Sequence, residues 1–171
     1  MIDRREFIAA ACGALLLPYA APVRARAASA LPDATRIALS KSPYVYVSPL
    51  RSDGSESRCH GEVWFGWIAG AVVVNTSPER WKAIAIDRGL DRARIWVGDF
   101  GRWKEMIGKN ETFRDGPSFD ARAEIANEAG LIDVLLEQYD GKYPAEIVTW
   151  RDKMKKGIAD GSRVLIRYRP L

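Results

Sequence analysis

The sequence predicts an α+β protein, mainly β, built as a small antiparallel barrel with peripheral helices. Three observations support this class. β-Rich runs follow one another at turn signals, the helices between them are short, and a final strand, at 163–168, returns at the C-terminal end. Hairpins in series with short helices between them favour an antiparallel barrel over a parallel sheet.

The first half of this pattern is a run of strands. Tyr44–Pro49 is β-rich and bounded by prolines, and Asp53-Gly54 is a hairpin signal. A second strand is expected at about 56–67, followed by a turn at Ala69-Gly70. Residues 71–75 are apolar on both faces, so this third strand is expected to be central.

The second half mixes helices with strands. Ser77 and Pro78 are suited to the cap and first position of a helix that runs to about Asp87. A fourth strand is expected at 93–98, and the region 101–118 is less regular. The remaining expected elements are helices at 121–130, 131–139 and 145–159, and the final strand.

Residues 1–30 have the pattern of an export signal. Arg4 and Arg5 are followed by Phe7, by an uncharged apolar stretch, and by Ala-x-Ala cleavage sites at 25–27 or 28–30. This order is typical of a signal peptide, and the paired arginines indicate the twin-arginine route. We therefore expect the twin-arginine translocase to export the protein to the periplasm or the medium.

Two alternatives remain open for this leader. The arginine pair is also compatible with a general secretory signal, and Cys12 with a lipoprotein. A bilayer span needs roughly 20 apolar residues, and the apolar stretch is only about half that length. We therefore expect no stable insertion in a membrane.

Composition limits the function of the remaining single domain, 31–171. The leader holds four of the 26 basic and two of the 22 acidic residues, so the domain is nearly balanced in charge. Such a balance does not favour binding to nucleic acid. Cys59 is the one cysteine left, so no internal disulfide can form.

The segment from Asn75 to Lys82 is suited to an anion. Here a buried strand leads to two hydroxyl side chains, two cations and an aromatic ring at a helix start: Thr76, Ser77, Arg80, Lys82 and Trp81. Unpaired N–H groups and the positive end of the helix dipole attract phosphate at such a place. Lys82 is expected to be exposed in the first helical turn.

Cys59 and His60 are candidates for a nucleophile and a base, because His60 is the one histidine of the chain. Neighbours in a strand point to opposite faces, so the two cannot act together within one strand. We expect one to be packed and the other exposed. Two such ligands also fall short of a zinc site, so no metal is expected.

The run from Tyr44 to Val97 resembles the flavin-binding split-barrel superfamily of pyridoxamine 5'-phosphate oxidase-like proteins. The similarity lies in the order of short motifs: 44–47, Asp53-Gly54, 62–65, Gly70, 72–76, Trp81-Lys82 and 94–97. Residues 142–144, Trp150 and 163–170 also resemble the closing part of small members.

The resemblance implies an FMN whose phosphate is contacted by Thr76 and Lys82. Arg80 stands where the family has a serine. The arginine-rich start of the second strand in true pyridoxamine phosphate oxidases has no clear counterpart here, and Arg58 is the one candidate for it. Vitamin B6 chemistry is therefore not expected.

The expected function is that of an exported FMN-binding oxidoreductase with an unknown small-molecule substrate, acting as a homodimer. Related split barrels bind the deazaflavin F420, which remains an alternative. Haem is another, with His60 as its candidate ligand. A barrel that binds without flavin or catalysis is the alternative from a different class.

Overall fold

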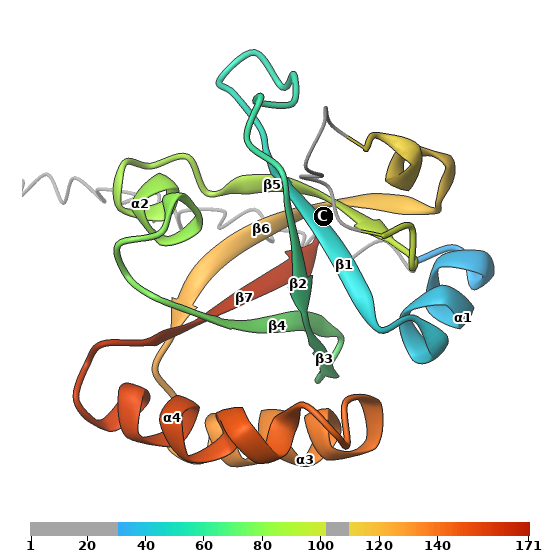
Figure 1. Cartoon of the computed structure of the whole chain (residues 1–171). Coiled ribbons are helices and arrows are strands. Elements are labelled where there is room, and N and C mark those ends of the chain that lie inside the picture. The colour runs from blue at the N-terminus through green and yellow to red at the C-terminus, as the bar shows by residue number, and fades with distance from the viewer. Residues whose placement is uncertain (1–30, 102–109) are drawn as a thin grey trace, which may run out of the picture.

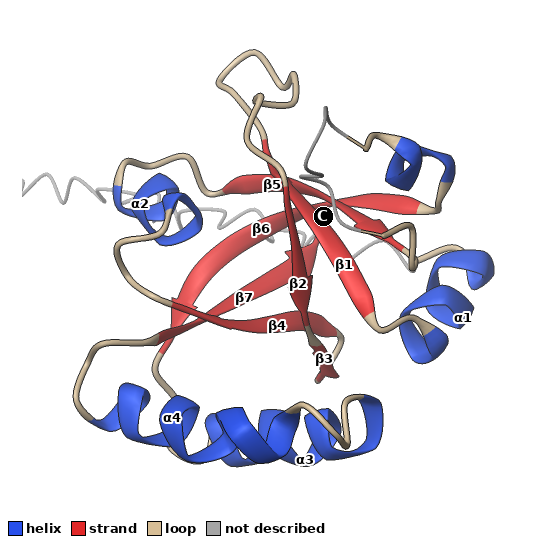
Figure 2. Ribbon diagram, in the orientation of Figure 1, coloured by secondary structure: helices blue, strands red, loops and turns tan. Residues whose placement is uncertain are grey.

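The computed structural model describes residues 31–101 and 110–171. Within them, seven antiparallel strands form one curved sheet in the order β2-β1-β5-β6-β7-β4-β3 (Figure 1, Figure 2). The strands are β1 (Tyr44–Pro49), β2 (Gly61–Trp64), β3 (Gly66–Ile68), β4 (Ala71–Thr76), β5 (Arg92–Val97), β6 (Ser118–Ala126) and β7 (Val164–Pro170). The helices are α1 (Asp33–Lys41), α2 (Trp81–Asp87), α3 (Leu131–Lys142), α4 (Ile147–Ala159) and a 3-10 turn, η1 (Thr112–Asp115).

The two edges of the sheet are joined by one stretch of chain. β2 and β3 are separated only by Phe65; β2 pairs with β1, and β3 pairs with β4. The sheet is thus a nearly closed barrel, split where the chain passes from β2 to β3. The predicted α+β split barrel with peripheral helices is confirmed.

Alternation along the strands produces two hydrophobic clusters. Inward side chains such as Val45, Val72 and Val74 fill the barrel together with Leu39 of α1 and Ala83 of α2. On the other side of the wall, outward side chains such as Val73 and Leu165 pack under α3 and α4, in one cluster with Leu135, Leu136 and Tyr139 of α3. The wall of β4 and β7 therefore has an inner face in the barrel and an outer face under the helices.

Most predicted strands are present. β1 has the predicted bounds, and the turn at Asp53-Gly54 is formed, with Gly54 at a φ of +82°. The second predicted strand is instead interrupted at Phe65 and forms β2 and β3. Helix α1 was not predicted, and residues 102–109 of the irregular region lie outside the described residues, as does the predicted leader at 1–30.

The prediction of a helix at 121–130 is wrong. Ala, Arg and Glu in this segment favour a helix, but residues 121–126 are the end of β6, which pairs with both β5 and β7, and 127–130 connect it to α3. Ala121 and Ala123 point into the barrel, whereas Arg122 and Glu124 are exposed. Pairing on both sides outweighs the local helix preference.

None of the helices within the described residues is long and apolar enough to cross a membrane.

Candidate functional site

The predicted anion segment leaves the barrel at the end of β4. Thr76 is the last, buried residue of that strand. The Ser77 hydroxyl accepts the N–H of Glu79 at 3.3 Å, and the Ser77 carbonyl accepts the N–H of Arg80 at 3.1 Å. This turn delays the helix, so α2 begins at Trp81 without a side-chain cap.

The prediction that Ser77 caps the helix is therefore wrong. The turn of Ser77, Pro78 and Glu79 uses the hydroxyl that a cap would have used. α2 is also only seven residues long, so its dipole is a weak basis for an anion site. Most of the attraction for an anion must therefore come from the charged and polar side chains of this segment.

Lys82 is partly buried, not exposed as predicted. Its Nζ lies 4.7 Å from the centre of the Trp81 ring. It also lies beside β2, because a Cβ built on Gly61 would be 4.0 Å from Nζ and 3.2 Å from Trp81 Cζ2. A side chain at position 61 would therefore press on the Trp81 ring and touch the Lys82 ammonium, and the glycine leaves room for the ring.

Burial, together with the smaller effect of the nearby charge of Arg80, lowers the pKa of Lys82 to about 8. No carboxylate among the described residues 31–101 and 110–171 forms an ion pair with Lys82. A desolvated cation without a counter-ion is unfavourable, and a bound anion would relieve it. This is the chemistry that a phosphate site requires.

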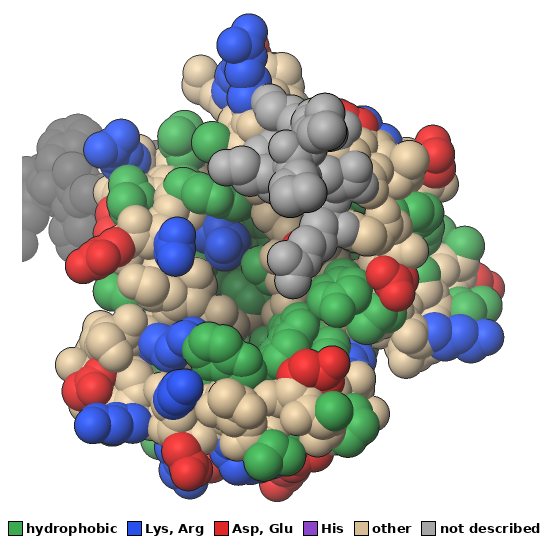
Figure 3. All heavy atoms as spheres, viewed as in Figure 1, with side chains coloured by type: hydrophobic (Ala, Val, Ile, Leu, Met, Phe, Trp, Pro, Cys, Tyr) green, Lys and Arg blue, Asp and Glu red, His purple; other side chains and the backbone are tan. Residues whose placement is uncertain are grey.

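The other predicted site residues are placed less uniformly. Trp81 packs against the inner cluster, and Arg80 is exposed at the start of α2. Arg58 is exposed in the connection between β1 and β2, and no described contact joins it to Thr76 or α2. Figure 3 shows Lys and Arg side chains over α2 and over the α3–α4 side of a hollow between them.

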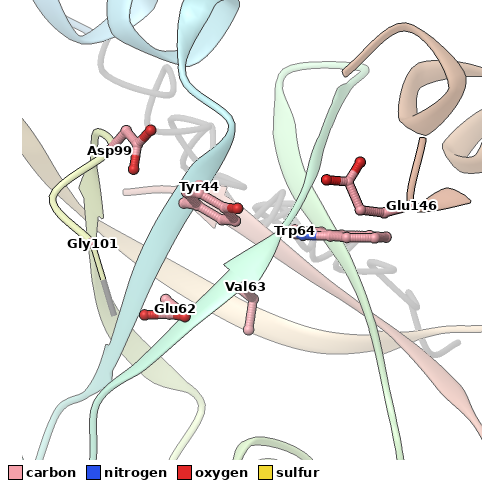
Figure 4. Close-up of a pocket in the computed structure, with 7 residues that line it drawn as sticks. All are labelled: Tyr44, Glu62, Val63, Trp64, Asp99, Gly101 and Glu146. Carbon is pink, nitrogen blue, oxygen red and sulfur yellow. The ribbon is translucent and has the colours of Figure 1, made fainter. Parts of the chain in front are cut away.

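A cleft of about 470 Å³ lies elsewhere, beside β1 and β2 (Figure 4). In Figure 4 the Tyr44 ring lies between the Asp99 carboxylate and the side chains of Trp64 and Glu146. The lining residues are Tyr44, Glu62, Val63, Trp64, Asp99, Gly101 and Glu146. Three carboxylates make this cleft a poor place for a phosphate, and the sequence pattern did not reveal it.

A second polar cluster involves His60. Its Nδ1 lies 2.7 Å from the Ser48 hydroxyl and 4.0 Å from a Glu56 oxygen, and its Nε2 lies 3.4 Å from Arg114 Nη2. Arg114 Nη1 donates to Glu56 at 2.9 Å. Serine and glutamate face the same ring nitrogen, so the cluster lacks the geometry of a catalytic triad.

The expected division between Cys59 and His60 is confirmed: Cys59 is exposed and His60 is buried. No group of three or more metal-ligating side chains occurs in the part of the chain that the structure describes. His60 is held among protein groups at both ring nitrogens, so it is a buried structural histidine in this arrangement.

Comparison with solved structures supports the fold. HutZ, the haem storage protein from Vibrio cholerae, superposes with a TM-score of 0.50 and 12% identity, over 80% of this chain and 87% of its own. Rv2991, a conserved hypothetical protein from Mycobacterium tuberculosis, gives 0.52 and 20%, over 85% and 84%. The chain has the split-barrel fold.

No model of a protein family matches the chain, and no curated protein is similar to it in sequence. At these identities the solved structures establish the fold alone. The site must therefore be argued from the residues of this chain.

Proposed function

We propose that the protein is an exported split-barrel oxidoreductase that binds FMN and acts on a small-molecule substrate. The observation that carries the proposal is Lys82, a partly buried cation without a carboxylate partner in the described residues, beside Gly61 at the start of β2. This is the position at which the resemblance to flavin-binding split barrels predicted the cofactor phosphate.

The residues at this end of the barrel fit such a cofactor. Lys82 would provide the charge, and the hydroxyls of Thr76 and Ser77 and the guanidinium of Arg80 are additional candidate contacts. Gly61 places no side chain against the Lys82 ammonium, which would lie 4.0 Å from a Cβ at that position. When bound, FMN supplies the redox chemistry, and the chain supplies binding and orientation.

The acidic cleft complements this site. Glu62, Asp99 and Glu146 would repel the phosphate, whereas the rings of Tyr44 and Trp64 offer apolar contact. The cleft is therefore assigned to uncharged or cationic parts of a ligand and the phosphate to Lys82.

Haem is less well supported, although one structural relative is a haem storage protein. His60 would have to break its contacts with Ser48 and Arg114 before either ring nitrogen could bind iron. The deazaflavin F420 remains a candidate, because a phosphate site at Lys82 serves it equally well.

An absorbance spectrum tests the proposal. The protein would be purified from a host that makes flavin, deazaflavin and haem. We expect a flavin spectrum, and we expect the flavin-free protein to bind FMN more tightly than riboflavin, which lacks the phosphate. A deazaflavin spectrum or a haem Soret band would show that the cofactor is F420 or haem and not FMN. A protein without any chromophore that binds FMN and riboflavin equally weakly would favour a barrel without flavin.

The export part of the proposal rests on Arg4 and Arg5. Replacing both with lysine is expected to leave the precursor in the cytoplasm. Unchanged periplasmic yield would instead indicate a general secretory signal.

We also propose a homodimer, because two-fold pairing is the commonest soluble assembly and aromatic side chains such as Trp64 and Trp96 are only partly buried. Light scattering of the loaded protein at micromolar concentration is expected to give twice the chain mass. A monomer that keeps its flavin would contradict this.

A further inference from the structure

Arg163 lies at the same end of the barrel as Lys82. Thr76, the last residue of β4, is paired with Val164, the first residue of β7, so Arg163 stands next to the point where β4 ends. Its Nη1 donates to the Asn75 Oδ1 at 2.7 Å, and its guanidinium lies 5.8 Å from the centre of the Trp150 ring.

The positions of its neighbours hold this guanidinium in place. The stem of Arg163 lies over Gly157 of α4, where a Cβ would come within 2.7 Å of Arg163 Cγ. Asn75 thus fixes one end of the guanidinium, and Trp150 lies beside it. Arg163 has no carboxylate partner in the described part of the chain. Its side chain is only partly buried, so donors other than the one bonded to Asn75 can reach a ligand.

Lys82 and Arg163 are on opposite faces of the barrel wall. Val74 points into the barrel and Val73 points under α3 and α4, so Asn75, two residues after Val73, is on the outer face. Arg163, bonded to Asn75, is on that outer face as well.

Lys82 is on the inner side of the wall. Val63 packs against the inner cluster, so Gly61, two residues before it on β2, has the same orientation. The Lys82 Nζ lies next to Gly61. The two cations therefore face opposite sides of the wall, which favours a separate negative partner for each.

We propose that this end of the barrel binds two separate negative groups, and that Arg163 contacts the second of them, a carboxylate or phosphate of an anionic substrate. The inference rests on the proposed function, which assigns the cofactor phosphate to Lys82. Asn75 and Trp150 are positioning residues that orient the Arg163 guanidinium. The substrate class is therefore a small organic anion.

The test measures binding of benzoate, phenyl phosphate and benzyl alcohol to the purified protein by calorimetry and by tryptophan fluorescence. We expect at least one of the two anions to bind and the neutral alcohol to bind about tenfold more weakly or not at all. Comparison of benzoate with phenyl phosphate distinguishes a carboxylate substrate from a phosphate substrate.

Substitution of Arg163 then locates the contact. Arg163→Gln is expected to weaken binding of the preferred anion about tenfold and to leave FMN affinity unchanged. Arg151→Gln is the matched control, because it removes an arginine of α4 that already has a carboxylate partner, Asp140. It is expected to leave anion binding unchanged. Arg163→Lys keeps the charge but loses the forked geometry of the guanidinium, so an intermediate loss of anion affinity is expected. This variant also provides the test if Arg163→Gln does not fold.

Two results would overturn the inference. The first is the absence of an Arg163 effect: either both variants keep the wild-type affinity for the anion, or neither anion binds the wild-type protein at millimolar concentration. The other is a loss of FMN affinity alone, which would make Arg163 part of the cofactor site. If FMN fails to bind but the anion result holds, the cofactor proposal fails and the Arg163 site remains.

Discussion

Two polar regions of the barrel differ in how their charges are paired. Around His60, Glu56 contacts Arg114, Arg94 and the Trp96 indole, so the cations there have a carboxylate. In the second region, Lys82 beside Gly61 and Arg163 beside the end of β4 have no carboxylate partner among the described residues. A closed network supports the fold, whereas cations without carboxylate partners indicate a place where a ligand completes the pairing.

The largest expected effect comes from a substitution in the closed network around His60. Glu56→Ala removes a side chain that is only 13% exposed and leaves Arg114 and His60 without it. We expect a loss of about 2–4 kcal/mol in the free energy of unfolding, measured with urea, and unchanged FMN affinity per folded molecule. Glu111→Ala, which removes a more exposed partner of the same arginine, is expected to cost under about 1 kcal/mol. Equal losses would mean that the His60 cluster is no more than a set of surface pairs.

The next effect tests the open region. Lys82→Met removes the charge while keeping most of the apolar stem, so FMN affinity is expected to fall roughly ten- to a hundredfold and riboflavin affinity to change little. Lys142→Met is the matched control, because burial also lowers the pKa of Lys142 to about 8. Equal losses for FMN and riboflavin would mean that Lys82 shapes the pocket generally and does not contact the phosphate.

The preference for FMN over riboflavin is expected to depend on pH. Lys82 has a pKa of about 8 in the folded protein and loses its charge above it. The ratio of the two affinities, measured by fluorescence titration, should therefore fall severalfold between pH 7 and pH 9.5. The Lys82→Met variant should show no such fall, and a wild-type ratio that stays constant would exclude Lys82 as the phosphate contact.

A smaller effect concerns stability without ligand. The pKa of Lys82 is lowered from 10.5 to about 8 on folding, so between these pH values the unfolded chain binds more protons and stability rises with pH. Below pH 8 the folded protein bears the full cost of the buried charge. Lys82→Met should then be more stable than wild type at pH 7, by about 1–3 kcal/mol, and the difference should shrink by pH 10. Urea midpoints at both pH values measure it, and a variant less stable at pH 7 would contradict it.

The smallest effect is at Cys59. Its side chain is exposed and takes no part in the His60 cluster, so Cys59→Ser should change the unfolding free energy by less than about 0.5 kcal/mol. Cofactor content should also stay the same. Loss of activity with the flavin retained would show that the thiol takes part in the reaction.

Local sequence predicted the strands well where one signal dominated. β1 starts directly after Pro43 and ends at Pro49. Gly54 takes the positive φ of the Asp53-Gly54 turn, and the apolar strand β4 is paired with a neighbouring strand on each side. The region 121–130 failed because its composition favours a helix while its pairing with β5 and β7 makes it a strand. Pairing between distant segments cannot be read from a local window.

The sequence by itself determined the antiparallel α+β class, the turn positions and the cations near the end of β4, because alternation and turn residues act over a few positions. Only the tertiary structure decided that Lys82 is buried beside Gly61, that Glu56 and Arg114 enclose His60, and that Arg163 stands on the opposite face of the wall from Lys82. Burial and charge pairing depend on segments far apart in the chain, and these two properties distinguish a structural cluster from a binding site.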